Sequence, residues 1–321
     1  MQSVAVIGLG NISHRHRKNL KALKPDARVI AMPASNRQLT TLPAHADACV
    51  TQLNELIELR PEYVIVASPA NLHASHGKSL LEAGIPCLIE KPLGASLDQA
   101  QELLRCAQKP SAPACAVGYC LRFMPTARIM KDLVQQQVVG EIYNIHIEVG
   151  QYLPQWRSGL DYRDSVSARK ELGGGALLEL SHELDYARWI FGPLALSHAH
   201  LRSSSELGLE VEDLVDVSLR TEHDAHVQIH LDFLQRQPQR FCRVIGNKGR
   251  LDWNLLRNEL VLTDSQGQSQ QFGDSHWQAN TMYLDMLDNF HNQIAQRPYQ
   301  GASVAQALEV VNLIDVIKQS A

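Results

Sequence analysis

The sequence lacks long apolar runs and closely spaced cysteines, and each absence excludes a class of protein. No uninterrupted apolar segment approaches the roughly 20 residues that span a bilayer, so a membrane protein is not expected. The six cysteines include no CxxC pair, which favours buried free thiols in a reducing compartment. No basic and apolar leader precedes the strand expected at residues 3–7. We therefore expect a cytoplasmic protein.

Excess charge and internal repetition are absent as well. The net charge is only -4, which gives no reason to expect a nucleic acid as a partner. No segment repeats at a solenoid period, and none is of low complexity. The composition is 45% hydrophobic and 20% charged, as in ordinary globular proteins, and 321 residues suffice for one large or two medium domains.

The first 120 residues alternate short apolar strands with amphipathic helices. The strands are expected at residues 4–7, 29–32, 63–68, 87–89 and 114–118. Helices between such strands make crossover connections, which are right-handed and produce a parallel sheet. The pattern therefore predicts a first α/β domain with a parallel sheet over residues 1–120.

A glycine-rich turn follows the first strand. The chain reads Gly8-Leu-Gly10-Asn11-Ile12-Ser13, and an amphipathic helix begins there. The two glycines permit a tight turn and the close approach of a pyrophosphate, which would lie at the helix N-terminus beside Asn11 and Ile12. Ser13 replaces the third glycine of the G-x-G-x-x-G pattern and is small enough for close packing. The pattern predicts dinucleotide binding; a tight turn without a ligand is the alternative.

The second strand ends without an acid. Domains of this kind bind the ribose 2′-hydroxyl of NAD with a carboxylate about 20 residues beyond the glycine turn. Here the chain reads Met32-Pro-Ala-Ser35-Asn36-Arg37. A carboxylate would repel a 2′-phosphate, whereas Ser35 and Arg37 can bind one. We therefore favour NADP over NAD without excluding NAD. The alternative is that Arg37 begins a solvated helix.

Two later strands of the same sheet end in polar residues. The strand at residues 63–68 ends at Ser68 and continues into Pro69-Ala-Asn71-Leu-His73, and the strand at 87–89 runs into Glu90-Lys91-Pro92. Ligands of open α/β sheets bind just beyond the carboxyl ends of the strands. We therefore expect both segments at the cofactor crevice. An ordinary surface salt pair of Glu90 and Lys91 is the alternative.

The pattern changes after Gly118. Segments 141–149, 215–220 and 227–233 alternate apolar and polar residues, and Gly246-Asn-Lys-Gly249 between two further strands is a hairpin signal. Such alternation predicts a large, mostly antiparallel open sheet with one covered face. We assign residues 121–321 to a second, α+β domain for substrate binding and dimerisation, whose C-terminal helix at 303–321 would pack back on the first domain.

Together these motifs resemble the glucose–fructose oxidoreductase / inositol dehydrogenase (Gfo/Idh/MocA) family. The resemblance covers essentially the whole chain. It rests on the glycine turn, Ser68–His73, Glu90-Lys91-Pro92, residues 118–123, and Gly173-Gly-Gly175 followed by His182-Glu-Leu-Asp185. It implies a Rossmann domain, a second domain whose open sheet forms a dimer interface, and NAD(P)-linked oxidation or reduction of sugars, polyols or related compounds.

The segment after the glycine motif carries the expected catalytic residues. On one continuous helix, Glu179, His182 and Asp185 would share a face about 120° wide. The resemblance implies that Lys91 relays the proton and binds the substrate oxygen, and that His182 is the catalytic histidine. Asp185 would orient His182 from the next turn, or serve a structural role instead. A metal site on these three side chains is not expected, because the family uses these groups without metal.

The sequence departs from the family pattern at two positions. Relatives usually have an aspartate four residues before the histidine, where Leu178 stands here. Either Glu179 takes over the acidic role, which we favour, or the role is absent. Cys120 stands where relatives often have asparagine. In the same segment, Tyr119 and Arg122 are candidate substrate contacts.

A long irregular segment, residues 151–170, precedes the glycine motif and is rich in arginine and aromatic residues. Loops of this length in compact domains are often functional. Trp156 could stack on a sugar or base, while Arg163 and Arg169, with Arg157, could bind carboxylate or phosphate. The segment therefore favours an acidic or nucleotide-linked sugar; a solvated surface loop is the alternative.

The expected function is that of an NAD(P)-dependent sugar or polyol dehydrogenase or reductase, possibly one of surface polysaccharide synthesis. One alternative is a sensor or regulator that binds dinucleotide without turnover. Another is an enzyme that retains its cofactor through an internal redox cycle, of glycosidase or isomerase type. The open sheet predicts a homodimer or homotetramer. The histidine pairs on single strands, His198 with His200 and His226 with His230, are interpreted as surface or interface residues.

Overall fold

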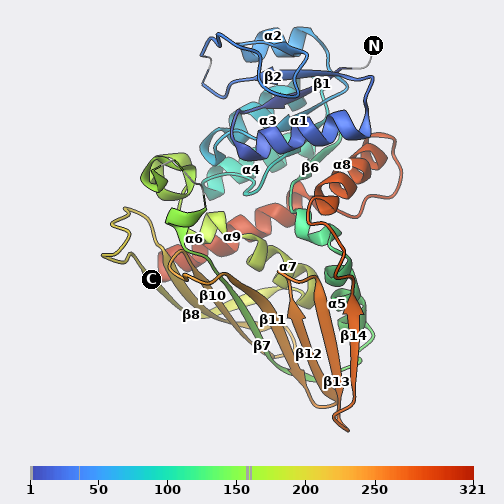
Figure 1. Ribbon diagram of the computed structural model, residues 1–321, viewed down its shortest axis with the longest axis vertical. Helices are drawn as coiled ribbons and strands as arrows, with labels where there is room; N and C mark the ends of the chain where they lie inside the picture. Colours follow the sequence, from blue (N-terminus) through green and yellow to red (C-terminus); the bar gives the residue numbers. More distant parts are fainter. Residues whose placement is uncertain (1–2, 36, 157–158, 160) are drawn as a thin grey trace. The chain divides into compact units, whose positions relative to one another are not determined.

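The computed structural model describes residues 3–35, 37–156, 159 and 161–321, and the chain forms two compact units (Figure 1). The first unit comprises Met1–Cys120 and Asn280–Val311, and the second comprises Leu121–Ala279 and Asn312–Ala321. The division falls inside the last helix, α9 (Val304–Ser320). No helix in the described part of the chain is long and apolar enough to span a membrane.

The first unit contains a seven-stranded sheet in the order β15-β6-β5-β4-β1-β2-β3. All neighbouring strands pair in parallel except β15 with β6. The strands are β1 (Ser3–Ile7), β2 (Arg28–Met32), β3 (Ala48–Cys49), β4 (Tyr63–Val66), β5 (Cys87–Ile89), β6 (Cys115–Val117) and β15 (Ala302–Ser303). Its helices include α1 (Asn11–Leu23), α2 (Leu53–Glu58), α3 (His73–Glu82), α4 (Leu97–Ala107) and α8 (Thr281–Ile294). The predicted parallel α/β sheet is confirmed.

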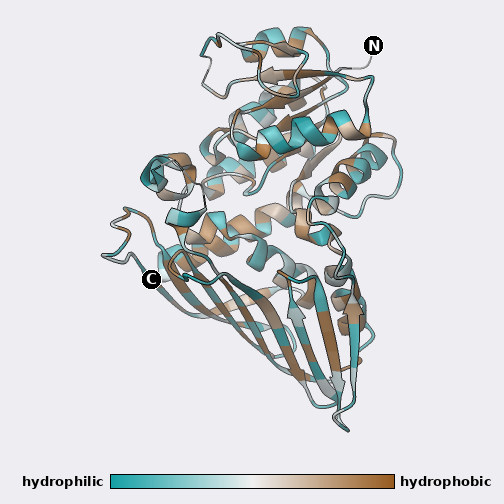
Figure 2. Ribbon diagram, in the orientation of Figure 1, coloured by the Kyte–Doolittle hydropathy of each residue, from teal (hydrophilic) through white to brown (hydrophobic). Residues whose placement is uncertain are grey.

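The strand order places a topological switch point at β1. The chain passes from β1 to β2 and β3 on one side, then crosses to β4, β5 and β6 on the other. β1 and β4 are wholly buried from Val4 to Ile7 and from Tyr63 to Val66, which explains their continuous apolar sequences. Figure 2 shows these strands as apolar ribbons. The carboxyl ends of β1 and β4 therefore form the crevice at which ligands bind in such sheets.

Helix α8 returns to the first unit, whereas the sequence analysis assigned it to the second domain. Phe290 and His291 of α8 stack edge-on against Tyr63 of β4, with ring centroids 5.7 and 4.9 Å away. The Gln293 amide donates to the carbonyl of Cys115 in β6. These contacts arise from an amphipathic face of α8 that the local sequence pattern could not assign to either sheet.

The second unit is built on an eight-stranded sheet in the order β14-β13-β12-β11-β7-β10-β9-β8. Only β7 and β10 pair in parallel. The strands are β7 (Ile142–Gly150), β8 (Leu194–Arg202), β9 (Leu214–Thr221), β10 (His226–Asp232), β11 (Gln239–Gly246), β12 (Gly249–Asn254), β13 (Glu259–Asp264) and β14 (Ser269–Gly273). Its helices include α5 (Pro125–Gln135), α6 (Ala176–Glu179) and α7 (His182–Phe191). The predicted, mostly antiparallel sheet is confirmed.

Alternation along the strands produces one buried and one outer face of this sheet. In β10, Val227, Ile229 and Leu231 have no exposed surface, whereas His226 and His230 lie on the outer face. The predicted hairpin is present, since β11 and β12 pair with Gly246 opposite Gly249. A period of two places every second side chain on the same face, as the sequence pattern indicated.

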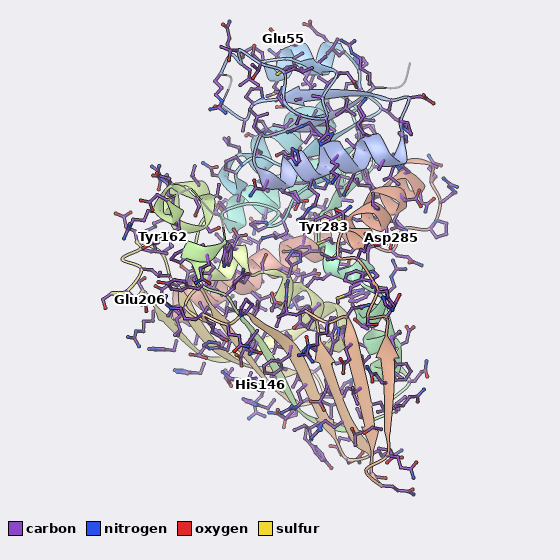
Figure 3. The ribbon with its side chains drawn as sticks, viewed as in Figure 1. Glu55, His146, Tyr162, Glu206, Tyr283 and Asp285 are labelled. Atoms are coloured by element: carbon purple, nitrogen blue, oxygen red, sulfur yellow. The ribbon has the colours of Figure 1, made fainter. Side chains whose placement is uncertain are left out.

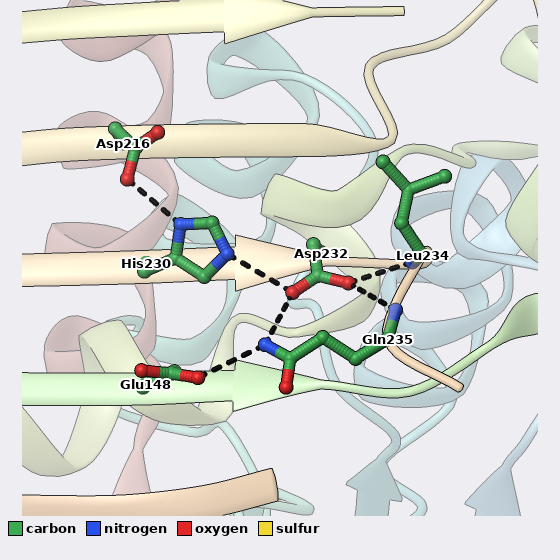
Figure 4. Close-up of polar contacts among 6 residues, drawn as sticks. All are labelled: Glu148, Asp216, His230, Asp232, Leu234 and Gln235. Atoms are coloured by element: carbon green, nitrogen blue, oxygen red, sulfur yellow. Dashed lines mark hydrogen bonds and ion pairs between the residues drawn. The ribbon is translucent and has the colours of Figure 1, made fainter. Parts of the chain in front are cut away.

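A polar network centred on His230 lies on the outer face (Figure 4). Its Nδ1 is 2.7 Å from Asp216 on β9, and its Nε2 is 3.0 Å from Asp232. Asp232 also accepts from the Leu234 and Gln235 amides. Hydrogen bonding to Asp232, together with the effect of Asp216, raises the pKa of His230 to about 9 against the lowering effect of burial. The network therefore stabilises the charged imidazole on this face.

The raised pKa of His230 predicts a pH-dependent stability. The folded state binds the proton more tightly than an unfolded histidine of pKa 6.5, so the contribution is complete below about pH 6.5 and is lost toward pH 9. It amounts to at most about 3 kcal/mol, reduced by screening because a quarter of the side chain is exposed. Urea denaturation of wild type and His230→Gln measures this contribution to the free energy of unfolding. The pH is varied between about 6 and 9.5, because His230 loses its proton within that range.

The matched control for this measurement is His226→Gln on the same strand. His226 contacts the Asn144 amide and the Ser218 hydroxyl but no carboxylate. We expect this variant to keep the pH dependence of the wild type, and His230→Gln to lose most of it. Equal pH dependence in wild type and His230→Gln would contradict a stabilising charge at His230.

Candidate active site

The glycine turn lies at the switch point of the first unit. Gly8 has φ +112, and a Cβ there would lie 2.2 Å from the carbonyl oxygen of Ala67, just beyond β4. A side chain at Gly10, by contrast, would meet nothing within 4 Å. Ser13 is not only small enough for close packing, as expected from the sequence. Its hydroxyl also donates a hydrogen bond to the same Ala67 carbonyl at 3.1 Å. The turn is thus packed against β4 on one side and open on the other.

This turn fits a dinucleotide. Helix α1 begins at Asn11 with Gly10 as N-cap, no described side chain caps it, and its first turn contains no acid. The first amide groups, those of Asn11 and Ile12 among them, are therefore available to an anion at the positive end of the helix dipole. Arg17 donates to the carbonyls of Gly8 and Ala44 and so connects the turn to the segment that precedes β3.

Ser35 and Arg37 lie beyond the end of β2, and both are exposed. No helix begins at Arg37, so the alternative of a solvated helix does not hold. No hydrogen bond or ion pair connects either side chain to another described residue. Asn36, between them, lies outside the described residues.

His73 connects the two polar strand ends of the first unit. Its ring nitrogens lie 2.8 Å from the Ser68 carbonyl and 2.7 Å from the Pro92 carbonyl, and the ring is buried. Burial lowers the pKa of His73, and the two carbonyl contacts oppose that effect. The Ser68 hydroxyl contacts His76, whose pKa burial lowers to about 4. Pro69 begins the short turn Ala70–Leu72, in which the Asn71 side-chain oxygen has no partner among the described residues.

Glu90 is held by a histidine that the sequence analysis did not select. His16 Nε2 lies 2.6 Å from the Glu90 carboxylate, and neither side chain is more than 8% exposed. Glu90 also accepts from the backbone amide of Lys91, and Gly118 leaves room for its carboxyl group. His16 lay on the apolar side of the predicted helix, and that placement is the signal that could have indicated a buried partner.

Tyr119 and Cys120 lie at the end of the same unit and are both buried. Tyr283 of α8 stacks edge-on against His16 at 6.3 Å, and Arg15 covers its ring at 4.5 Å. Burial, followed by the effect of Cys120, raises the pKa of Tyr283. Cys120 therefore lies close to Tyr283, which Figure 3 labels and which packs against the His16 partner of Glu90.

The prediction of one helix through Glu179, His182 and Asp185 is wrong. Helix α6 ends at Glu179, Leu180 leaves the helical region with φ -96 and ψ 25, and α7 begins at His182. The three residues therefore do not share one helical face. Glu179 accepts from the Ser167 hydroxyl at 3.1 Å. The glycine motif before α6 is itself closely packed, because a Cβ at Gly174 would lie within 2.8 Å of three carbonyl oxygens of residues 166–169.

Helix α7 is fixed by two buried ion pairs. Asp185 binds Arg122 through two bonds of 2.9 and 2.6 Å, and Glu183 binds Arg240 of β11 through two bonds of 2.7 and 3.1 Å. Both carboxylates are at most 1% exposed. Burial raises the pKa of Asp185 against the opposing effect of Arg122. The geometry favours the structural interpretation of Asp185, and the substrate contact expected of Arg122 stays a prediction. Glu183 and Arg240 were not selected from sequence.

The arginines of segment 151–170 are engaged by nearby groups. Arg163 is 60% exposed, covers the Tyr162 ring at 4.8 Å and lies 3.7 Å from the Asp161 carboxylate. Arg169 binds Glu171 at 2.5 Å. Trp156 packs edge-on against Phe233. Arg157 lies outside the described residues. No group of three or more metal-ligating side chains occurs in the described ranges, including the histidine pairs of β8 and β10.

The comparisons define the class of protein first. Residues 2–119 match an oxidoreductase family with an NAD-binding Rossmann fold, and residues 127–252 match the C-terminal domain of the same family. The protein is thus an oxidoreductase with an NAD-binding domain. It belongs to the Gfo/Idh/MocA family, which confirms the resemblance.

Individual relatives are distant but extend over nearly the whole chain. The D-glucoside 3-dehydrogenase of Escherichia coli (strain K12) is 22% identical, with 99% of this chain and 95% of that enzyme aligned. A levoglucosan dehydrogenase in complex with NADH and L-sorbose has a TM-score of 0.87 at 20% identity, covering 100% and 97% of the two chains. The WlbA dehydrogenase of Bordetella pertussis, with NADH and UDP-GlcNAcA, has a TM-score of 0.81 at 19% identity and covers 99% and 96%. The structural likenesses establish the fold.

The buried pair of Arg122 and Asp185 predicts a large loss of stability on truncation. Asp185→Ala leaves Arg122 buried and unpaired, so we expect it to lower the free energy of unfolding by about 3–5 kcal/mol. The exposed ion pair of Lys78 and Glu102 provides the comparison. We expect Lys78→Ala to lower the free energy of unfolding by only about 0–1 kcal/mol. Chemical denaturation followed by circular dichroism measures both. Similar losses in the two variants would contradict the assigned importance of the buried pair.

Proposed function

We propose that the protein is an NAD(P)-dependent dehydrogenase or reductase that transfers a hydride to or from a secondary alcohol or ketone of a sugar or polyol. The observation that supports it most directly is the glycine turn at the switch point of the sheet, which is closely packed at Gly8 and open at Gly10. Lys91 follows strand β5 of the same sheet. The sugar dehydrogenase names of its relatives agree with this substrate class.

The proposed roles follow from the chemistry of alcohol oxidation. The nicotinamide, when bound, accepts the hydride from the carbinol carbon. Lys91 binds the substrate oxygen and opposes its developing negative charge, and His182 accepts the hydroxyl proton. Glu179, held by the Ser167 hydroxyl, supplies the acidic group that relatives usually carry one residue earlier. Glu90, His73 and His16 position the segment from which Lys91 projects.

The assignment of Lys91 and His182 is tested by substitution. Lys91→Met and His182→Ala should each lower kcat by about a hundredfold or more, the usual contribution of a general acid or base, with cofactor Kd unchanged. Lys109→Met and His226→Gln serve as controls of the same residue types. The rate of NAD(P)H formation measures kcat, and fluorescence titration measures Kd. Near-normal turnover in Lys91→Met would contradict the mechanism.

For the cofactor we propose a preference for NADP, supported by the absence of an acid at the end of β2 and by the exposed, unengaged Ser35 and Arg37 among the described residues. Two structural neighbours are complexes with NADH, so the proposed preference rests on residues of this chain alone. A 2′-phosphate would accept a charge-assisted hydrogen bond from Arg37.

The cofactor preference is tested by titration of NADPH and NADH into the purified protein. Arg37→Ala should raise the Kd of NADPH about tenfold, the loss of one charge-assisted bond, and leave that of NADH unchanged. Arg105→Ala, which removes an exposed arginine from α4, is the control. Tighter binding of NADH by the wild type would reject the NADP preference and keep the enzyme assignment.

We further propose that the outer face of the eight-stranded sheet forms a homodimer or homotetramer interface. Its polar side chains are already ordered by contacts within the face. His146 stacks edge-on against Phe241, and Gln235 connects Glu148 with Asp232. A preordered surface lowers the entropic cost of association.

A further inference from the structure

Two cysteines face one another across neighbouring strands of the first unit. Cys87 is the first residue of β5 and Cys115 the first of β6, and the parallel register pairs them directly. Their sulfur atoms lie 3.6 Å apart. Neighbouring strands are separated by about 4.8 Å, and disulfides span Cα separations of about 4.4–6.8 Å. The sheet therefore holds the two thiols where a bond can form between them without movement of the strands.

A cavity of about 550 Å³ adjoins one of the two thiols. Cys115 contributes to its wall together with residues of α4, of α8 and of segment 303–305, all of which belong to the first unit. Cys87 does not contribute to the wall. Cys115 is 7% exposed, whereas Cys87 has no exposed surface. A small solute that enters the cavity therefore meets Cys115 before Cys87.

Helix α4 covers the face of the sheet on which the thiols lie. Ile89 is two residues beyond Cys87 and so shares its face. A Cβ at Gly77 of α3 would lie 2.8 Å from Ile89 and 2.9 Å from Leu103 of α4, which places both helices on that face. Two further residues of α4 line the cavity. The cavity is thus bounded by the helix that covers the thiol pair.

The two thiols differ in the way that stepwise oxidation of a pair requires. A peroxide oxidises an accessible thiol to a sulfenic acid, and a neighbouring thiol then condenses with that acid to a disulfide. Cys115 is the thiol beside the cavity. Hydrogen bonding to Cys115, followed by burial, raises the pKa of Cys87 well above its usual value. Cys87 is therefore suited to the second step and not to the first.

We propose that Cys87 and Cys115 form an oxidisable pair, in which Cys115 reacts with a hydroperoxide that enters the cavity and Cys87 converts the product to a disulfide. In the first step the Cys115 sulfur bonds to the terminal peroxide oxygen and the O–O bond breaks. The other oxygen leaves with the thiol proton, as water or an alcohol. In the second step the Cys87 sulfur displaces the hydroxyl group of the sulfenic acid, which leaves as water with the Cys87 proton. The peroxide gains the two electrons that the thiols lose.

The second thiol makes this oxidation reversible. A sulfenic acid without a neighbouring thiol proceeds to sulfinic and sulfonic acids, which thiol reductants do not restore. A disulfide is returned to two thiols by exchange with a thiol donor. An irreversible acid on Cys115 would also place a charge inside the sheet whose strand β5 runs into Glu90 and Lys91. The pair thus protects the segment proposed for catalysis from a buried charge.

The proposal is tested by locating the oxidised cysteines after treatment of the full chain with hydrogen peroxide. Mass spectrometry of peptides prepared without reduction should show Cys87 joined to Cys115, with a loss of about 2 Da that dithiothreitol reverses. Addition of oxygen to Cys115 in place of the bond, a disulfide that joins either residue to another cysteine, or no oxidation of the pair each overturns the proposal.

Variants separate the two roles. Cys87→Ala removes the second thiol, so Cys115 should gain about 32 Da as a sulfinic acid that dithiothreitol does not restore. Cys115→Ala should slow the oxidation of Cys87 by about tenfold or more, because Cys87 has no exposed surface. Oxidation of Cys87 at the wild-type rate in Cys115→Ala, or a reversible product in Cys87→Ala, contradicts the assigned roles.

Cys106→Ala is the matched control. Cys106 is a buried thiol of α4 in the same unit and lies outside the pair. This variant should form the bond between Cys87 and Cys115 at the wild-type rate, and loss of the bond would show that Cys106 takes part and overturn the assignment. Circular dichroism checks that the variants are folded, and the measurement on the wild type requires no variant.

Discussion

A buried carboxylate must be hydrogen-bonded or paired, and beside the residues proposed for catalysis its partner is a basic side chain in both units of the protein. Three buried carboxylates adjoin the residues proposed for catalysis, namely Glu90, Glu183 and Asp185. An ionised carboxylate without a partner would cost several kcal/mol to bury. The chain supplies each partner from a distant element. His16 pairs with Glu90, Arg240 with Glu183, and Arg122 with Asp185. Catalytic segments are thereby attached to the cores of their own units.

The two units meet this constraint with different geometry. Helix α7 is held by two arginine forks, each of which fixes both the distance and the plane of a carboxylate. His182, as the first residue of α7, takes its position from that arrangement. Lys91 follows a strand, and its two neighbours are held in turn, Glu90 by His16 and Pro92 by His73. The backbone on both sides of the lysine is thereby fixed to the first unit.

Short-range patterns predicted most of the fold. The glycine turn, the buried strands and the Gly246–Gly249 hairpin each depend on residues close in sequence, and these predictions are confirmed. The break between Glu179 and His182 was missed because no glycine or proline marks it in the sequence, where Leu180 and Ser181 stand. The partner of Glu90 was missed because His16 is 74 residues away and only the folded sheet brings them together.

The charge composition of segment 151–170 has to be read together with its local ion pairs, and the acidic or nucleotide-linked sugar that it favoured stays a prediction. Counting arginines in segment 151–170 indicated an anion-binding loop, but a charge already paired contributes little to recognition. Arg163 and Arg169 are paired with neighbouring carboxylates, whereas Asp164 keeps an unpaired one among the described residues. The net charge that a ligand meets at a site is thus set by the side chains that remain without an ion-pair partner. Local pairing depends on backbone turns such as Tyr162–Asp164, in which Asp161 caps the Arg163 amide. That geometry brings Arg163 back onto Tyr162, beside the Asp161 carboxylate.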